Sequence, residues 1–359
     1  MHLLTRLLSF VIIFIDFDFC FATKLIIDTD GAFDDIRALT IALTHPNAEI
    51  LAITTTHGSV SPEQAAINVD RIMRATRQTS IPLFIGSNDS LIPKGPVQVW
   101  EAVYGFDGLG GVPDVWPAAQ NISKVGANSM SAIDAIIGIV KTEPEVTLVC
   151  IGPLTNLARV IQKEPEIVKR LSRVIIMGGN YLAIGNTQTN STAEFNFLMD
   201  PEAAQIVLSN IHTMIVPWDT CFLKGPQYRY LVDYEESLRL NTNISNFLKS
   251  ITQKSREFSK EHGQHYAFID DIAVAIGIEA EIAEWTQQLY ANVELRNDAV
   301  TRGQVAIDWL SAAYDERKEQ FEANKVNNDN SWLAQTFVTQ YNVREINRLL
   351  LTAVGAQKS

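Results

Sequence analysis

Short apolar runs alternate with longer segments of helical spacing through the first two-thirds of the chain. Residues 25–27 form the first apolar run, which predicts a buried strand. Residues 62–77 carry apolar side chains three or four positions apart, which predicts an amphipathic helix. Further strands or helices are predicted in the same way at 49–56, 81–85, 130–141, 146–151, 156–163, 173–177, 200–208 and 212–216. The alternation predicts an α/β fold with an open, mostly parallel mixed sheet and helices on both faces.

The last third of the chain follows a different pattern. Residues 235–261 are charged and amphipathic and predict helix. Two strand-like stretches, 288–295 and 304–308, are expected to pair with each other before a closing helix at 343–354. A long connection at 178–196, rich in Gly and Asn, interrupts the earlier alternation. Connections of this length inside a compact domain are usually functional, so we expect it to contribute to a site.

The first 22 residues have the composition of a secretory signal. A weakly basic start precedes an apolar core, and Cys20 and Ala22 are small residues at positions −3 and −1 of a cleavage site. The apolar core is shorter than the ~20 helical residues that span a bilayer. We therefore expect residues 1–22 to be a signal peptide and residues 23–359 to form a single domain. The mature protein is expected to be secreted and extracellular.

Composition narrows the class of partner. The net charge of −12, without a run of Lys or Arg, argues against nucleic acid and anionic membrane as partners. Only three cysteines are present, which excludes a disulfide scaffold, although one bridge between Cys150 and Cys221 stays possible. The Asn-x-Ser/Thr triplets, which fit an exported glycoprotein, begin at Asn88, Asn121, Asn190 and Asn243.

Four carboxylates gather at the turn after the first predicted strand. Asp28 and Asp30 end the strand, and Asp34 and Asp35 begin the next helix. Like charges this close repel each other unless a cation neutralises them, and a hard divalent ion with oxygen ligands is the obvious candidate. The alternative is that Asp28 or Asp30 caps the helix while Asp34 and Asp35 interact with its dipole. That alternative accounts for only part of the cluster.

Polar residues also follow the later predicted strands. His57 comes directly after the second strand, either as a site residue or as a loop histidine with a satisfied ring. Asp270 and Asp271 begin a late apolar run and could complete a metal site that starts at the first turn. Because ligands bind at the carboxyl ends of strands in open α/β sheets, we expect these groups to meet at one edge of the sheet.

The order of these motifs resembles that of the calcium-dependent nucleoside hydrolases, or inosine–uridine-type nucleoside N-ribohydrolases. The family opening D-x-D-P-G-x-D-D is similar to Asp28-Thr29-Asp30-Gly31-Ala32-Phe33-Asp34-Asp35. The other similar motifs are Thr54-Thr55 with Gly58, Asp107-Gly108-Leu109-Gly110, Gly152-Pro153-Leu154-Thr155-Asn156, Met177-Gly178-Gly179, Gly185-Asn186, Glu194-Phe195-Asn196 and Asp200-Pro201-Glu202-Ala203-Ala204. The resemblance covers residues 24–275.

The resemblance implies both a cofactor and a reaction. The implied Ca²⁺ ligands are Asp30, Asp35, the main-chain carbonyl of Ile151 and a late aspartate, which aligns best on Asp270 with Asp271 as the alternative. The implied substrate-binding residues are Asp34, Ser59, Asn186, Glu194 and Asn196. Asp30 would also act as the general base for a water that attacks C1′ of a ribonucleoside, which releases free base and ribose.

Several positions depart from the family pattern. Gly31 and Ala32 replace Pro-Gly, and Ala32 would be strained if the turn needs a positive φ there. Ser59 replaces a ribose-binding Asn, and Ile269 replaces a His that protonates the leaving base in some members. Without that His we expect purine nucleosides as substrates, with the base stacked on an aromatic side chain. The aromatic candidates are Trp100, Tyr104, Trp218 and Phe268.

These observations support one leading hypothesis and two alternatives. The leading hypothesis is a secreted, Ca²⁺-dependent hydrolase of ribonucleosides, expected by analogy to be a homodimer or homotetramer. The first alternative is a non-catalytic extracellular nucleoside-binding protein, motivated by Ala32, Ser59 and Ile269. The second is an aspartyl-phosphate phosphatase that uses Asp28 and Asp30, although Ala32 stands where such enzymes have Thr or Val.

Overall fold

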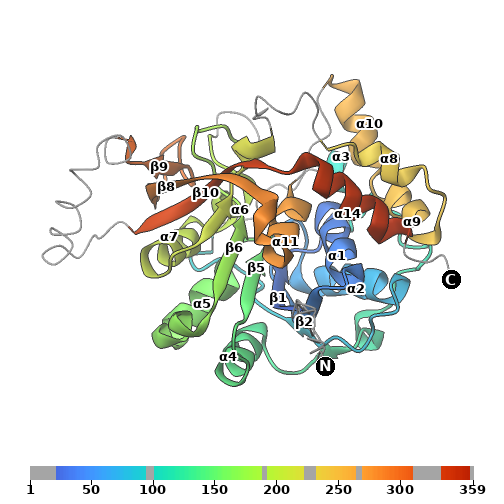
Figure 1. The fold of residues 1–359 in the computed structure, drawn as a ribbon, viewed down its shortest axis with the longest axis horizontal. Coiled ribbons are helices and arrows are strands. Elements are labelled where there is room, and N and C mark those ends of the chain that lie inside the picture. Colours follow the sequence, from blue (N-terminus) through green and yellow to red (C-terminus); the bar gives the residue numbers. More distant parts are fainter. Residues whose placement is uncertain are drawn as a thin grey trace, which may run out of the picture.

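The computed structural model describes residues 22–93, 101–187, 192–221, 232–263, 269–309 and 333–355 (Figure 1). Nearly all of the predicted signal peptide lies outside the described residues, as do Asn190, Trp100 and Phe268. Within the described ranges, every helix is too short or too polar to cross a membrane. Cys150 and Cys221 are both buried free thiols, so the bridge that the sequence left open is absent.

Ten strands of the described residues form one sheet, in the order β4-β3-β2-β1-β5-β6-β7-β10-β8-β9. β1 (Thr23–Thr29) lies in its centre, parallel to β2 (Ala48–Thr55) on one side and to β5 (Thr147–Cys150) on the other. The remaining strands are β3 (Leu83–Ile85), β4 (Ala127–Asn128), β6 (Arg173–Met177), β7 (Met214–Val216), β8 (Ala283–Val293), β9 (Val305–Ile307) and β10 (Ala334–Tyr341). Among the described strands, only the pairs that involve β8 are antiparallel. The predicted open, mostly parallel mixed sheet is confirmed.

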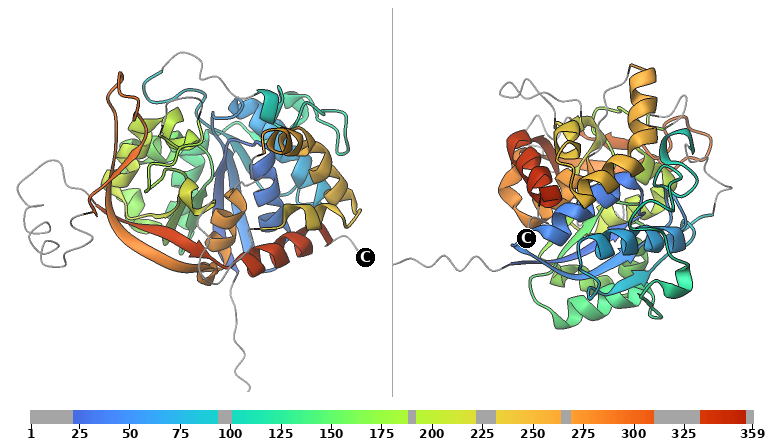
Figure 2. Two further views of the ribbon diagram at one scale, coloured as in Figure 1. Left: turned by 90° about the horizontal axis from the view of Figure 1, so that it is seen from above. Right: turned by 90° about the vertical axis from the view of Figure 1, so that its right-hand side faces the viewer.

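Helices cover both faces of this sheet because neighbouring side chains of each strand point to opposite faces (Figures 1 and 2). Ile27 packs into one core and Ile26 into the other. The first core is covered by α1 (Phe33–Thr44), α2 (Pro62–Ala75), α11 (Asp270–Ile278) and α14 (Val343–Gly355). The second is covered by α4 (Ala132–Thr142), α5 (Thr155–Lys163) and α7 (Pro201–Asn210). Because both faces of the sheet are buried, successive residues of the central strands are apolar, without the alternation of a half-exposed strand.

The C-terminal third differs from its prediction in two ways. β10 is a strand that the sequence did not reveal, and it lies between β7 and β8. Its pairing also extends β8 back to Ala283, through half-buried and exposed residues that carry no alternating strand pattern. The expected pairing of the two strand-like stretches is confirmed, since β8 and β9 are antiparallel neighbours.

The predicted helix at 235–261 is three shorter helices: α8 (Tyr234–Leu238), α9 (Asn243–Ile251) and α10 (Gln253–Glu261). The break between α8 and α9 lies at Asn241, which has φ +54°, and at Thr242, whose side chain caps α9. A residue with positive φ cannot continue a right-handed helix, so the chain turns there.

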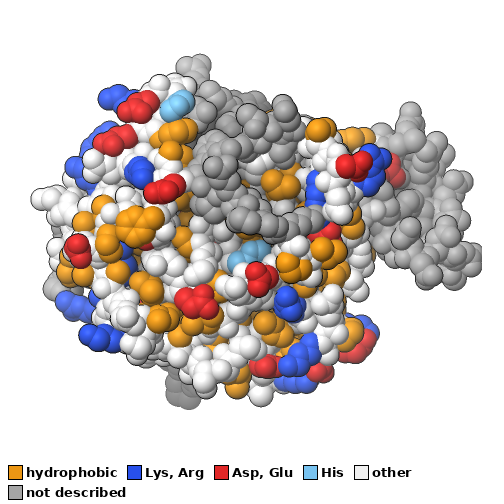
Figure 3. All heavy atoms as spheres, turned by 180° about the vertical axis from the view of Figure 1, so that it is seen from behind, with side chains coloured by type: hydrophobic (Ala, Val, Ile, Leu, Met, Phe, Trp, Pro, Cys, Tyr) orange, Lys and Arg blue, Asp and Glu red, His pale blue; other side chains and the backbone are white. Residues whose placement is uncertain are grey.

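The distribution of charged side chains on the surface agrees with the prediction that nucleic acid is not a partner. On the face shown in Figure 3, the Lys and Arg side chains of the described residues are scattered among Asp and Glu rather than gathered into one patch. A nucleic-acid footprint would require clustered basic side chains.

Candidate functional site

An acidic pocket opens where the central parallel strands end. The residues that follow β1, β2 and β5 contribute to it, and the N-terminus of α11 closes one side. With its open mouth included, the pocket holds about 350 Å³ of empty space. All the site residues predicted from the sequence line it, namely Asp30, Asp34, Asp35, Ser59, Ile151, Asn186, Glu194, Asn196 and Asp270. The carboxyl edge of the sheet is therefore the candidate site, as expected for this architecture.

In the turn between β1 and α1, the residue with positive φ is not the one that the sequence motif suggested. Gly31 carries the positive φ of +69°, whereas Ala32 has an ordinary extended backbone with φ −77°. The concern that Ala32 is strained was wrong, because the left-handed position falls one residue earlier. The Ala32 N–H donates to the Asp35 carboxylate at 3.0 Å, so neither Asp28 nor Asp30 caps the helix. Only the capping part of that alternative to a metal site was wrong, because Asp34 and Asp35 do lie in the first turn of α1.

Replacing Gly31 by Pro is expected to destabilise the fold by about 2 kcal/mol or more, because proline cannot adopt a positive φ. A Cβ at this position would also lie 2.6 Å from the Cα of Ala65. Ala32→Gly is the matched control and should cost less than about 1 kcal/mol. Thermal unfolding of both variants measures the difference, and a Gly31→Pro protein as stable as the wild type would contradict this turn geometry.

Three carboxylates in the pocket are close enough to share one cation. Asp34, Asp35 and Asp270 are buried, and each offers an oxygen within 4.8 Å of the others. Asp34 Oδ1 is buried without a hydrogen-bond partner, so it is available as a ligand. Ile151 lines the same pocket, and its main-chain carbonyl accepts the Asn196 NH₂ at 3.2 Å. An all-oxygen set of this kind fits a hard divalent cation such as Ca²⁺.

Burial and mutual repulsion act together on these acids. Burial raises the pKa of the Asp34 carboxyl to about 7, and the charge of Asp30 adds to the effect. The pKa values of Asp35 and Asp270 are raised well above their usual range for the same two reasons. A bound cation would favour the charged forms and reverse these shifts. The cluster is therefore suited to holding a cation.

The late aspartate of the site is Asp270. The neighbouring carboxylate of Asp271 points away from the acids and accepts a hydrogen bond from Arg37 at 3.2 Å. Tyr234 also donates to Asp271, at 3.5 Å. The alternative left open by the sequence, in which Asp271 faces the metal, is not the arrangement that the structure shows.

Asp30 is placed beside these acids rather than among them. Its Oδ2 accepts the N–H of Ser59 at 2.5 Å, and its carboxyl shares a hydrogen bond with Asp35. Gly58 lies against it so closely that a Cβ there would overlap the carboxylate. Burial raises the pKa of Asp30, while these hydrogen bonds oppose the rise. The three carboxylates that lie close together are thus those of Asp34, Asp35 and Asp270, although the sequence predicted that Asp34 binds ribose. The prediction that Asp30 is a Ca²⁺ ligand stays a prediction.

Amide groups from the connection after β6 also line the pocket. The Asn196 side chain donates to the carbonyls of Ile151 and Met177, each at 3.2 Å, which leaves its own oxygen to accept from a hydroxyl. The Asn186 oxygen accepts the N–H of Phe195 at 2.8 Å, so its NH₂ group is the part that can donate to a ligand. Such groups can bind the hydroxyls of a sugar.

Glu194 has a structural role in addition to the predicted one. Its two oxygens accept the N–H groups of Gly179, Asn196 and Phe197 at 2.7 to 3.1 Å, which caps α6 (Phe195–Met199). Burial raises the pKa of the Glu194 carboxyl to about 7. The same side chain thus fixes the backbone that presents Asn196.

Two prominent sequence features lie behind the pocket. Asp28 is buried and accepts from Thr54 at 2.5 Å and from Asn156 at 2.8 Å, so it connects β1 to β2 and to the start of α5. The ring of His57 contacts the Thr155 hydroxyl at 2.8 Å, which confirms the reading as a loop histidine with a satisfied ring. Neither residue lines the pocket.

The pocket wall also contains aromatic and apolar side chains. Tyr104 and Trp218 were two of the four aromatic candidates, and both line the pocket. Tyr104 stacks on Phe33, with the ring centroids 5.2 Å apart. Met177 and Phe195 are lining residues that the sequence singled out only as parts of motifs. The strand-end position of Met177 is the signal that could have identified it.

Sequence comparison gives an independent view of the chain. The family model described as "Inosine-uridine preferring nucleoside hydrolase" matches residues 25–333. "Probable uridine nucleosidase 2" of Arabidopsis thaliana is 33% identical over 187 residues, which are 52% of this chain and 56% of that protein. "Pyrimidine-specific ribonucleoside hydrolase RihA" of Salmonella arizonae is 28% identical over 295 residues, 80% of this chain and 89% of that protein. The chain spans little more than half the length of the plant relative.

Comparison with solved structures also finds nucleoside hydrolases. An "Inosine-Guanosine Nucleoside Hydrolase" superposes with a TM-score of 0.78 at 26% identity and covers 92% of this chain and 98% of its own. A "Purine-Preferring Ribonucleoside Hydrolase from Gardnerella vaginalis" superposes with a TM-score of 0.73 at 24% identity, over 93% of this chain and 98% of its own. The architecture of the sheet and its helices is therefore shared with these proteins.

Proposed function

Because the chain belongs to the family of inosine-uridine preferring nucleoside hydrolases, we propose that it hydrolyses the N-glycosidic bond of ribonucleosides and releases free base and ribose. The observation that carries the proposal is the pocket itself. It brings the Asp34, Asp35 and Asp270 carboxylates into one pocket with the amides of Asn186 and Asn196. The carboxylates are suited to a cation and the amides to sugar hydroxyls.

The chain's own residues divide the chemistry between them. Asp34, Asp35, Asp270 and the Ile151 carbonyl would hold a Ca²⁺ ion. When bound, that ion supplies positive charge that lowers the pKa of a water molecule.

Asp30, oriented by the Ser59 N–H, accepts the proton of the attacking water, whose hydroxyl bonds to C1′ as the bond to the base breaks. The departing base takes up a proton from solvent, and Asp30 returns its proton to solvent. The surrounding acids favour the positive charge that develops on the ribose ring as the bond to the base breaks.

The base preference that we propose is for purines. Tyr104 and Trp218 line the pocket, and no described lining residue is a histidine that could protonate the leaving base. Ile269, at the position of that histidine, is buried in the hydrophobic core. Stacking on an aromatic ring is the remaining route to activate the base, and the larger purine rings stack over more area. The names of the relatives divide on this point, since some are uridine- or pyrimidine-specific and others prefer purines.

A ribose-release assay tests the proposal. The full chain is incubated with Ca²⁺ and inosine, adenosine, guanosine, uridine or cytidine, and reducing sugar is measured. We expect release from at least the purine nucleosides. Release from pyrimidine nucleosides alone would overturn the base preference but not the reaction. No release from any nucleoside, together with calorimetric binding, would favour the non-catalytic nucleoside-binding protein instead.

We also propose that the protein is secreted and glycosylated. Three of the four sequons lie in the described residues, and Asn88, Asn121 and Asn243 are all exposed. Expression of the full chain in a eukaryotic secretory host is expected to give protein in the medium whose mass falls on treatment with an N-glycosidase. Asn→Gln variants at the three positions should each remove one glycan. Retention of an unglycosylated chain inside the cell would contradict secretion.

The homodimer or homotetramer expected from the resemblance stays a prediction. Light scattering of the purified chain measures its mass in solution. A monomeric mass at all concentrations would overturn that expectation without affecting the proposed reaction.

A further inference from the structure

A buried arginine lies directly behind the acidic pocket. Arg37, on α1, is only 3% exposed. Its guanidinium donates to the carboxylate of Asp271 on α11 at 3.2 Å. It also lies 3.9 Å from the ring centroid of Tyr234 on α8. One side chain therefore connects three helices in the core on this face of the sheet.

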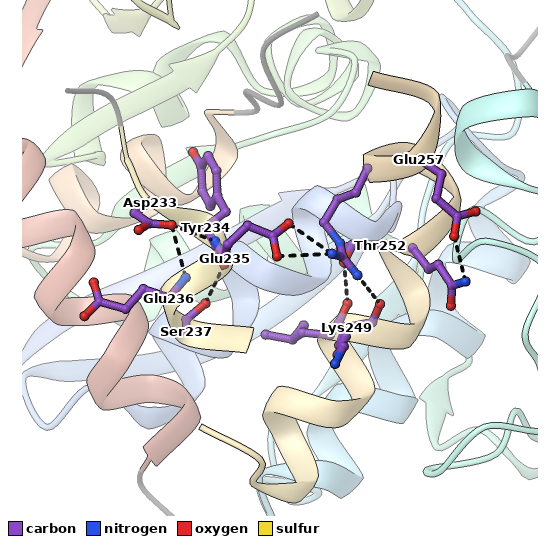
Figure 4. A network of polar contacts seen from close by, with 11 residues as sticks. Asp233, Tyr234, Glu235, Glu236, Ser237, Lys249, Thr252 and Glu257 are labelled. Carbon is purple, nitrogen blue, oxygen red and sulfur yellow. Dashed lines mark hydrogen bonds and ion pairs between the residues drawn. The ribbon is translucent and has the colours of Figure 1, made fainter. Parts of the chain in front are cut away.

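The surroundings of Tyr234 hold this arrangement in place. Asp233 caps α8 by accepting two backbone N–H groups, and Glu235 forms an ion pair with Arg256 on α10 at 3.0 Å (Figure 4). The aromatic ring is thus presented to Arg37 by a short helix that is fixed at its start and tied to its neighbour. The contact between Arg37 and Tyr234 is therefore held in place by hydrogen bonds and an ion pair around α8.

Packing alone does not account for a charge at this place. The Arg37 and Asp271 side chains are 4% and 0% exposed, so both charges are removed from water. A buried ion pair of this kind is commonly no more stabilising than a well-packed apolar pair of similar volume. An apolar contact would serve equally well to join α1 to α11. The position of the charge therefore calls for another explanation.

That position relates Arg37 to the pocket acids. Arg37 lies one helical turn after Asp34 on α1, and its partner Asp271 is adjacent to Asp270. The positive charge of Arg37 attracts the carboxylates of both Asp34 and Asp270. The same cationic side chain thus acts on both acids, one on each of the two helices.

We propose that Arg37 is a positioning residue that supplies a permanent counter-charge to the pocket acids, so that α1 and α11 stay packed when the pocket holds no cation. This inference rests on the proposed binding of Ca²⁺ by Asp34, Asp35 and Asp270. With Arg37 in place, the cation contributes only part of the charge compensation that the acids require. The ion can then leave and return without unfolding of the two helices that carry its ligands.

Three variants separate this role from packing. Arg37→Met removes the charge and keeps much of the length of the side chain. Arg37→Lys keeps the charge but loses the planar group that lies against Tyr234. Arg302→Met is the matched control, because Arg302 forms a largely buried ion pair with Glu202 at 2.5 Å in the core on the other face of the sheet.

The experiment is the melting temperature of each full chain, in excess chelator and in saturating Ca²⁺. Without calcium, Arg37→Met should melt about 5 °C or more below the wild type. The rise on adding calcium should be at least twice that of the wild type, because the ion then compensates charge that Arg37 no longer compensates. Arg37→Lys should show the wild-type rise, and Arg302→Met should lower both temperatures equally.

A calcium-induced rise in Arg37→Met that equals the wild-type rise, or is smaller, would overturn the inference and leave Arg37 as a packing residue. A Lys variant that behaves like the Met variant would overturn it as well, because the charge would then not be the cause. If Arg37→Met fails to fold, Arg37→Gln, which also removes the charge but keeps a hydrogen-bonding group, takes its place, and the same two outcomes apply. A wild type whose melting temperature ignores calcium would refute the proposed cation site, which is a distinguishable result.

Discussion

Replacing Asp30 by Asn is expected to lower kcat for ribose release by about 10²- to 10⁴-fold, the usual contribution of a general base. The amide has the shape of the carboxyl and can still accept the Ser59 N–H that holds Asp30 at 2.5 Å. It cannot accept a proton from water. Initial rates at saturating nucleoside and saturating Ca²⁺ measure the loss, since saturation removes any effect on metal affinity.

Asp89→Asn provides the control for this prediction. Asp89 is an exposed aspartate in the loop after β3, and the pocket does not include it. Its variant should keep the wild-type kcat. The Asp30→Asn protein should also melt no lower than the wild type, because one of several buried like charges has been removed. A kcat within tenfold of the wild type would exclude Asp30 as the base.

Replacing Asp270 by Ala should cost about 10³-fold in kcat/KM and eliminate measurable Ca²⁺ binding. The variant removes one of three carboxylates whose oxygens lie within 4.8 Å of one another. Two acids and a carbonyl leave too few ligands for an ion that takes six to eight oxygens. Calorimetric titration with Ca²⁺ measures the binding, and ribose release measures the activity.

Asp28→Asn is the control for Asp270→Ala, because it changes a buried aspartate that is not a proposed metal ligand. Asp28 belongs to the same turn and is 1% exposed, but its carboxylate accepts from Thr54 and Asn156 behind the pocket. We expect this variant to be less stable and still to bind Ca²⁺. If Asp270→Ala bound the ion as tightly as the wild type, the three-carboxylate site would be wrong.

The pocket residues could be predicted from the sequence because they lie at strand ends. The apolar run before Asp30 and the one before Ile151 identify two adjacent parallel strands, and such strands bring their carboxyl ends to one edge. The pairing of β1 with β5 then places Asp28 beside Cys150, although the two residues are 122 positions apart in sequence. Local pattern and fold class together were sufficient for this part of the site.

Contacts that depend on three-dimensional packing could not be predicted in this way. Arg37 and Asp271 are 234 positions apart, and nothing in either local pattern indicates the other. The choice between Asp270 and Asp271 depends on that contact, since one carboxylate is taken by the arginine. The close approach at Gly31 is a second example, because a Cβ there would lie 2.6 Å from the Cα of Ala65 on α2, and nothing in the local sequence indicates this contact.

The strand β10 was missed for a related reason. Residues 334–341 contain two Gln and two Thr, and buried members of that group are satisfied by partners elsewhere in the chain. Gln335, fully buried, accepts the N–H and hydroxyl of Thr213 and donates to the carbonyl of Leu208. A polar side chain can be buried when residues far away in the sequence satisfy its hydrogen bonds, but from the sequence alone it is predicted to lie on the surface.

The most direct test is ribose release by the metal-stripped full chain as Ca²⁺ is added back. We predict less than about a hundredth of the full rate in excess chelator. The rate should return with added Ca²⁺, half-maximal at the dissociation constant that calorimetry gives for the same preparation. A stripped protein that hydrolyses nucleosides at the full rate in chelator would contradict a cation held by Asp34, Asp35 and Asp270.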